Sequence, residues 1–189
     1  PNGAGKSTTL RLILGLLHPT AGEVKVFGET MSLSTGYLRR RIGYLPQGEH
    51  YPKNLTPINY LELAGRLRGM PRKECHRRIS SLLHAVDLLG AASTRIGNLS
   101  AGMTTRMAIA ASMVNEPDLL LWDETTAGLV PTGRKYALDL IQELKSQGKT
   151  MIVSTHLLPV ADNVCDYIGV LNQAKVVFCG SVMEMKQVR

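Results

Sequence analysis

The first residues of the chain have the types and spacing that bind phosphate. Gly3 and Gly5 lie in a glycine-rich turn that leads into Lys6 and Ser7, where a helical pattern begins. Glycines allow backbone N–H groups to curl around a phosphate, and a helix N-terminus adds positive potential. Lys6 would reach the outer phosphates of a nucleotide, and the Ser7 hydroxyl would bind Mg²⁺. The residues expected to bind nucleotide here are Asn2, Gly3, Ala4, Gly5, Lys6, Ser7 and Thr8.

A second candidate is a pair of acids at the end of an apolar strand. Leu119–Trp122 is apolar without alternation, and Asp123 and Glu124 follow it. At the carboxyl edge of a parallel sheet, Asp123 suits Mg²⁺ binding and Glu124 suits polarising an attacking water. Two acids after an apolar run can also simply end a strand. The phosphate loop upstream favours a nucleotide site.

Three further segments place polar residues at the ends of predicted elements. Gln47 follows a strand predicted at 42–45, and His156 follows one predicted at 150–154. Ser100 is a good N-cap, so the residues after it begin a helix whose dipole and free N–H groups favour an anion. A histidine at a strand end is on its own more often structural. Its position among the other motifs is what favours a function.

Taken in order, these motifs resemble those of the ATP-binding subunits of ABC (ATP-binding cassette) transporters. The phosphate loop, Gln47, the signature LSAGM at 99–103, the pair Asp123-Glu124 and then His156 follow the family's order over essentially the whole chain. The resemblance implies ATP and Mg²⁺ as cofactors, with Gln47 at the metal or the attacking water and His156 at the γ-phosphate. It implies that nucleotide held by a second ATPase subunit is bound by Ser100, Ala101, Gly102 and Met103.

The chain departs from the family's pattern at several positions. The signature has Ala101 and Met103 where the best-known form has Gly and Gln, and the methionine is similar to that of exporter subunits. Val130 replaces an aspartate of the D-loop, which puts coupling between two sites in doubt, and Thr125 replaces a proline. The strand before the phosphate loop and the adenine-stacking aromatic are missing. Residues 1–189 are therefore expected to form an N-terminally truncated ABC ATP-binding domain.

The elements that would position these residues alternate between strands and helices. Strands are predicted at 23–27, 42–45, 119–122, 150–154, 167–171 and 175–179. Helices are predicted at 6–17, 56–69, 72–89, 100–114, 133–146, 157–164 and after 180. This alternation predicts an α/β fold, a P-loop NTPase with a mostly parallel sheet covered by helices. Successive helices between about 50 and 115 predict a helical subdomain inserted in that core.

Composition excludes several other classes of protein. A chain of 189 residues that is 44% hydrophobic and 20% charged is neither disordered nor collagen-like. No apolar run is long enough to cross a bilayer. Three scattered cysteines without a CxxC motif argue against a disulfide framework or a zinc cluster. Residues 1–95 hold 14 Lys and Arg against 6 Asp and Glu, which suits either an anionic partner or solvated helix faces.

The prediction for function is ATP binding and hydrolysis that power transport of a substrate across a membrane, with export favoured. The expected location is peripheral, at the cytoplasmic face of the cell membrane. The expected partners are a transmembrane permease subunit and a second ABC ATPase subunit, in a homodimer or a heterodimer, and no nucleic acid is expected. Two alternatives stay open: a non-transport ABC ATPase that acts on ribosomes or DNA, and a nucleotide-binding module with weak turnover.

Overall fold

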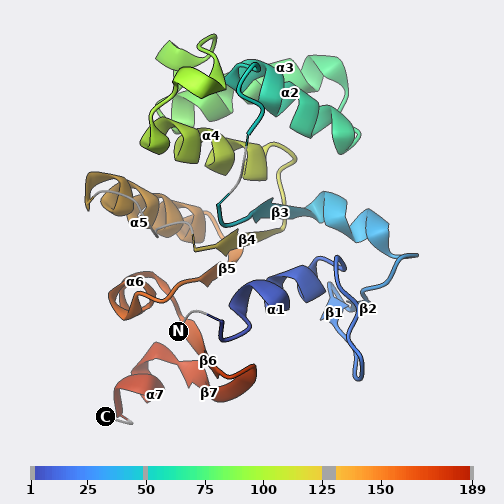
Figure 1. Ribbon diagram of the computed structural model, residues 1–189, viewed down its shortest axis with the longest axis vertical. Helices are drawn as coiled ribbons and strands as arrows, with labels where there is room; N and C mark the ends of the chain where they lie inside the picture. The colour runs from blue at the N-terminus through green and yellow to red at the C-terminus, as the bar shows by residue number, and fades with distance from the viewer. Residues whose placement is uncertain (1–2, 49–50, 125–130, 188–189) are drawn as a thin grey trace. The chain divides into compact units, whose positions relative to one another are not determined.

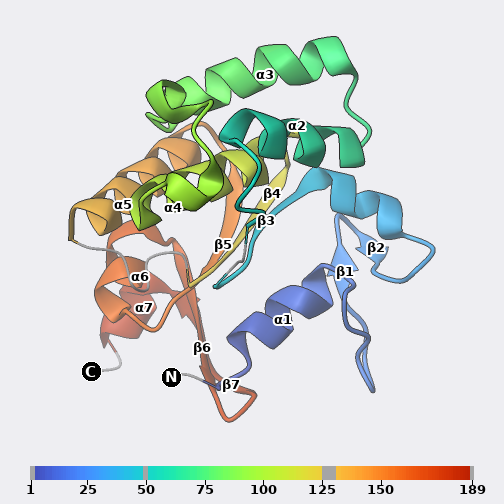
Figure 2. The same cartoon turned by 45° about the horizontal axis from the view of Figure 1, so that its top comes forward.

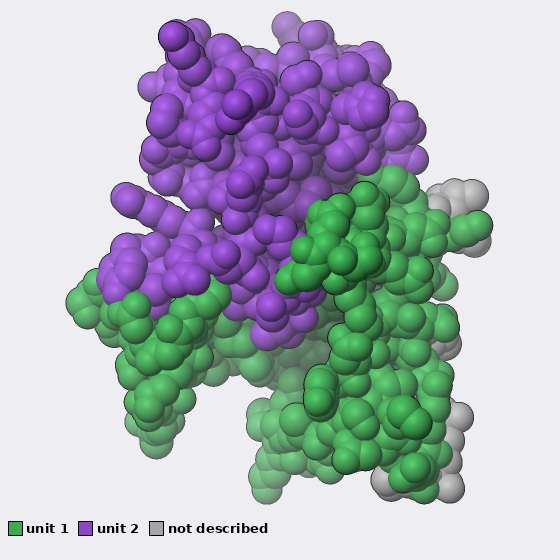
Figure 3. All heavy atoms as spheres, turned by 180° about the vertical axis from the view of Figure 1, so that it is seen from behind, with its two compact units in different colours: residues 1–36, 123–148, 153–189 green, residues 37–122, 149–152 purple. Residues whose placement is uncertain are grey.

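The computed structural model describes residues 3–48, 51–124 and 131–187, and Figure 1 labels its elements. The chain divides into two compact units, which have separate colours in Figure 3. Unit 1 comprises 1–36, 123–148 and 153–189, and unit 2 comprises 37–122 and 149–152. Each unit therefore joins segments that are far apart in the sequence.

A three-stranded sheet runs in the order β3 (Ile42–Leu45), β4 (Leu119–Asp123) and β5 (Thr150–Ser154). β3 and β4 are parallel, with Ile42 opposite Leu119. Every residue of β4 is buried, as its unbroken apolar run predicts. β5 alternates between exposed and half-buried positions before its buried last residue, so it is less completely covered than β4.

The core of unit 2 lies where β3 packs against α4 (Ala101–Met113). Gly43 makes this close approach possible, because a Cβ at this position would lie 2.1 Å from the carbonyl oxygen of Ser112. The fully buried Trp122 donates its indole N–H to the Ser112 hydroxyl at 3.3 Å. That hydroxyl donates to the carbonyl of Ile109 at 2.7 Å, so the polar atoms of this core are paired.

Three helices of unit 2 pack on one another: α2 (Pro57–Leu67), α3 (Arg72–Ala85) and α4, which Figure 2 shows from a second side. Thr56 caps α2 by accepting the backbone N–H of Asn59 at 3.3 Å. The shorter 3₁₀ helices are η1 (Gly36–Arg41), η2 (Leu89–Ala91) and η3 (Ile96–Asn98). The bounds 50–115 of an inserted helical subdomain stay a prediction. In the described part of the chain, no helix has the length and hydropathy to span a membrane.

Unit 1 contains the remaining helices and two antiparallel hairpins. Its helices are α1 (Lys6–Ile13), α5 (Pro131–Ser146), α6 (Leu158–Val164) and α7 (Val182–Gln187). Its hairpins join β1 (Lys25–Val26) to β2 (Glu29–Thr30) and β6 (Tyr167–Asn172) to β7 (Lys175–Ser181). Lys145 links α5 to the chain after α6, because its ammonium contacts the carbonyl of Val164 at 3.3 Å and Asp166 at 2.7 Å.

Several elements are shorter than the sequence predicts, and three of them end next to a residue with a positive φ angle. α1 stops at Ile13 instead of residue 17, because Gly15 adopts φ +65°. The strand predicted at 23–27 pairs only at β1, since Phe27 and Gly28 turn the hairpin with positive φ. α3 stops before residue 89 because Asp87 has φ +51°. The boundaries of β3 and β5 agree with the prediction.

Candidate nucleotide site

The glycine-rich loop of unit 1 has the backbone conformation that its sequence predicts. Gly3 and Gly5 have φ angles of +75° and +99°, which side chains with a Cβ rarely adopt. Gly5 is the N-cap of α1, and its carbonyl accepts the N–H of Thr9 at 2.9 Å. Buried Ala4 ties the loop to the β6–β7 turn by accepting the N–H of Ala174 at 3.2 Å. The loop therefore leads directly into the N-terminus of α1, where Lys6 follows.

Glu124 lies at the centre of a charged cluster in unit 1. Its Oε1 is 3.1 Å from the Lys6 ammonium, and its Oε2 is 2.7 Å from Nδ1 of His156. The Glu124 side chain is 3% exposed, whereas those of Lys6 and His156 are 14% and 39% exposed. The fold thus brings together three residues that the sequence assigned to one nucleotide site.

The neighbours of Glu124 favour its ionised form. Burial by itself would raise the pKa of this carboxyl group. Hydrogen bonds from His156 and Lys6, together with their positive charge, outweigh burial and hold the pKa below its ordinary value. Glu124 is therefore a carboxylate at neutral pH, able to accept further hydrogen bonds but only weakly basic.

Asp123 and Glu124 are held at the end of β4 by the last residue of β5. The Ser154 hydroxyl donates to Oδ1 of Asp123, and both its Oγ and its carbonyl oxygen accept the backbone N–H of Glu124, each at 3.1 Å. Glu124 has φ +51°, an uncommon conformation for a residue other than glycine. Asp123, Glu124 and Ser154 are all buried.

The other predicted site residues are divided between the two units, and some lie outside the described residues. Gln47 is exposed in the turn after β3, and Ser100 caps α4 by accepting the N–H of Met103 at 3.2 Å. Ser100, Ala101 and Gly102 are exposed, whereas Met103 is half-buried. In unit 1, Ser7 is half-buried and Thr8 exposed on α1. The residues that lie outside the described part are Asn2, Thr125 and Val130.

The sequence pattern assigned Ser154 no role beyond the end of the strand predicted at 150–154. The available signal was a hydroxyl residue at the end of an otherwise apolar strand, two positions before His156. A hydroxyl there has to find partners when the strand end is buried. Which partners it finds depends on the neighbouring strand, so the pattern alone did not reveal the bond to Asp123.

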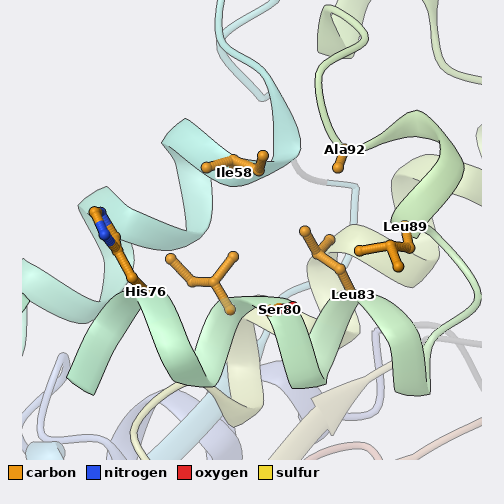
Figure 4. A pocket seen from close by; sticks show the side chains of 7 residues that line it. Ile58, His76, Ser80, Leu83, Leu89 and Ala92 are labelled. Carbon is orange, nitrogen blue, oxygen red and sulfur yellow. The ribbon is translucent and has the colours of Figure 1, made fainter. Parts of the chain in front are cut away.

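A separate pocket in unit 2 contains none of the motif residues. It lies between α2, α3 and η2, and Ile58, Leu83 and Leu89 line it (Figure 4). His76 is its one ionisable lining residue and contacts Glu62 at 3.5 Å. Apart from His76 and Ser80, its lining is apolar.

Solved structures with the same fold define the class of protein. An ATP-binding subunit of an ABC transporter matches the whole chain with a TM-score of 0.85 and 31% identity, over 78% of that chain. The ATP-binding cassette MJ0796, in a dimeric post-hydrolysis state bound to ADP and Pi, matches 96% of this chain and 82% of its own, with a TM-score of 0.86 and 29% identity. The fold is that of a P-loop NTPase, as the sequence predicted.

The sequence match identifies the family. The family described as ABC transporter matches residues 1–127, and the chain belongs to it. An uncharacterized ABC transporter ATP-binding protein, YxlF of Bacillus subtilis, is 40% identical over 99% of the chain and 61% of its own length. The Nod factor export ATP-binding protein I of Burkholderia lata is 35% identical over 96% of the chain and 60% of its own. The chain thus spans about three fifths of these relatives.

Proposed function

We propose that this chain binds and hydrolyses ATP as the cytoplasmic ATPase subunit of an ABC exporter. The observation that carries the proposal is the convergence of Lys6 and His156 on the buried Glu124 beside the glycine-rich loop. These residues come from three separate segments of unit 1, and each has a distinct use in phosphoryl transfer to water. The export relative of Burkholderia lata supports export as the direction of transport.

The residues around Asp123 fit a magnesium ion. Asp123 is 1% exposed, and across the described residues the one hydrogen-bond partner of its carboxylate is the neutral hydroxyl of Ser154. A buried carboxylate without a cation is costly, and Mg²⁺ prefers oxygen ligands. Asp123 and the Ser7 hydroxyl, both in unit 1, would hold the ion, and a role for Gln47 stays a prediction from the sequence. When bound together with ATP, Mg²⁺ supplies charge neutralisation at the phosphate oxygens.

The chain's own residues would orient the reacting groups. The N–H groups around Gly3 and Gly5 and the Lys6 ammonium would bind the phosphates. The ionised Glu124 would accept a hydrogen bond from the attacking water and fix its direction, because a carboxylate of lowered pKa polarises water rather than fully deprotonating it. His156, partly exposed and bonded to Glu124, would contact the γ-phosphate.

The signature segment would act on nucleotide held by a second copy or a related subunit. Ser100, Ala101 and Gly102 are exposed at the start of α4, whose first turn contains no acidic residue that would repel phosphate. We therefore propose a dimer of ATPase subunits joined to a transmembrane permease, at the cytoplasmic face of the membrane and without a nucleic-acid partner. Co-purification with a multi-span membrane protein would support this assembly, whereas association with ribosomes or DNA would contradict it.

The central test of the activity is Glu124→Gln. We expect ATP hydrolysis to fall about 10²–10³-fold, the scale for losing one positioned catalytic group, while ATP binding is retained. The variant should also accumulate as an ATP-bound dimer. Glu74→Gln makes the same charge change at an exposed site on α3 and should leave turnover unchanged. Near-normal turnover of Glu124→Gln would remove Glu124 from the reaction, and absence of turnover in the unaltered protein would favour a binding module.

A further inference from the structure

We infer that Ser154 is a positioning residue that holds both acids of the hydrolytic site, an inference that rests on the proposed ATPase function. The Ser154 hydroxyl has one hydrogen and two lone pairs. Its hydrogen goes to Oδ1 of Asp123, and a lone pair accepts the backbone N–H of Glu124 at 3.1 Å. One side chain at the end of β5 therefore contacts both consecutive acids at the end of β4.

The bond to Asp123 fixes the direction of the carboxylate. In this contact the serine hydroxyl is the donor and Oδ1 of Asp123 is the acceptor. With Oδ1 occupied by Ser154, the carboxylate plane cannot rotate freely, and Oδ2 has no hydrogen-bond partner within the described ranges. Oδ2 is thus presented as the oxygen that a metal ion would take. Residues behind a metal ligand commonly orient it in this way.

The bonds to Glu124 hold an unfavourable backbone conformation. A glutamate at φ +51° persists only where surrounding contacts determine it. The Glu124 N–H is shared between the carbonyl oxygen and the hydroxyl of Ser154, both at 3.1 Å. This turn directs the Glu124 side chain to Lys6 and His156. Loss of the hydroxyl would remove one of the two acceptors and loosen the direction of the side chain.

A role in positioning differs from a role in packing, and the variants Ser154→Thr and Ser154→Val separate the two. Threonine and valine have nearly the same shape, but only threonine keeps the hydroxyl. We expect Ser154→Thr to stay close to the unaltered protein. Ser154→Val should lower kcat for ATP about 10- to 100-fold and weaken Mn²⁺ binding to the ADP-bound protein by a similar factor, the usual cost of losing a group behind a metal ligand.

The experiment uses the complete protein and three readouts. Steady-state hydrolysis gives kcat and KM, electron paramagnetic resonance gives Mn²⁺ affinity in the presence of ADP, and calorimetry in EDTA gives the ADP affinity without metal. The last should change much less than the Mn²⁺ affinity, because Ser154 makes no hydrogen bond to the glycine-rich loop within the described residues and reaches Lys6 only through Glu124. Ser146→Ala, which removes an exposed hydroxyl on α5, is the matched control and should change none of the three.

Equal kcat and equal Mn²⁺ affinity for the Thr and Val variants would overturn the inference, as would a Val variant that loses only thermal stability. If Ser154→Val does not fold, Ser154→Ala replaces it, since alanine adds no bulk at this site. Failure of the proposed function would look different: the unaltered protein would not hydrolyse ATP. The Mn²⁺ measurement would still report on the hydroxyl in that case, because it requires no turnover.

Discussion

Replacement of Glu124 by glutamine should tighten the binding of ADP in the absence of metal. In the nucleotide-free protein, Lys6 and Glu124 form an ion pair at 3.1 Å, with side chains that are 14% and 3% exposed. A phosphate that binds Lys6 has to break or share this pair. The free energy of that contact therefore opposes nucleotide binding, and a variant with a weaker contact should bind more tightly.

The magnitude follows from the two kinds of hydrogen bond. A hydrogen bond that involves a charged group contributes about 1.5–3 kcal/mol net; the pair of two charged groups lies near the upper end of this range, and the bond from Lys6 to a neutral amide lies near the lower end. The difference of roughly 1 kcal/mol or slightly more corresponds to an ADP affinity about five- to tenfold higher in Glu124→Gln. Removing the negative charge beside the phosphates acts in the same direction.

Titration calorimetry with ADP in EDTA measures this effect without any contribution from hydrolysis. Glu74→Gln controls for the change in net charge, because Glu74 is exposed on α3. In a Lys6→Ala background, Glu124→Gln should raise the ADP affinity by a smaller factor, because the Lys6–Glu124 ion pair is already absent. An ADP affinity that is unchanged or weaker in Glu124→Gln would show that the ion pair does not compete with nucleotide, and would refute this reasoning.

Three further outcomes are expected. Lys6→Ala should weaken ADP binding about 10- to 100-fold in the same calorimetric assay, because a charge-assisted bond to phosphate is lost; unchanged affinity would exclude Lys6 as a phosphate ligand. The folded pKa of Glu124 lies below its ordinary value of 4.5, so its contribution to stability is present above that pH and is lost as the pH falls through the lower value. The free energy of unfolding, measured in urea from pH 7 to pH 3, should therefore fall more steeply in the unaltered protein than in Glu124→Gln. Parallel dependences on pH in the two proteins would contradict this. Gly43→Ala should reduce the free energy of unfolding by about 3 kcal/mol because of the clash with Ser112, whereas Gly90→Ala, whose added Cβ would meet no atom within 4 Å, should not.

The strands and helices were largely predictable because the residues that define each element lie within it or directly beside it. β3 and β5 have the predicted limits. Each contains an apolar run, and β3 ends before Pro46 whereas β5 ends at polar residues. α1 was predicted too long, although Gly15 carried the signal for its end: the leucines that follow it continue the apolar pattern after the backbone has already turned. The spacing of apolar residues indicates which side chains are buried, but it does not indicate where the backbone adopts a positive φ angle.

The sequence predicted which residues form the site, but it did not predict which of their side chains contact one another. Motif order placed Lys6, Glu124 and His156 in one site, and the structure brings them together. The direct Lys6–Glu124 pair and the two bonds of Ser154 depend on distances between side chains from different segments, which spacing in the sequence does not encode. The left-handed turn at Glu124 likewise has no local signal, because neither glycine nor asparagine marks the position.

The single tryptophan of the chain gives the protein a built-in optical probe. Trp122 is fully buried in the core of unit 2, with its indole N–H bonded to Ser112, and it directly precedes Asp123. A shielded indole emits at shorter wavelengths than one in water, so a red shift of the intrinsic fluorescence reports exposure of this one core. A loss of helical circular dichroism at constant emission would therefore come from helices outside this core, in unit 1 or at the periphery of unit 2. Unfolding of the Trp122 core can thus be distinguished from the loss of other helices without any added label.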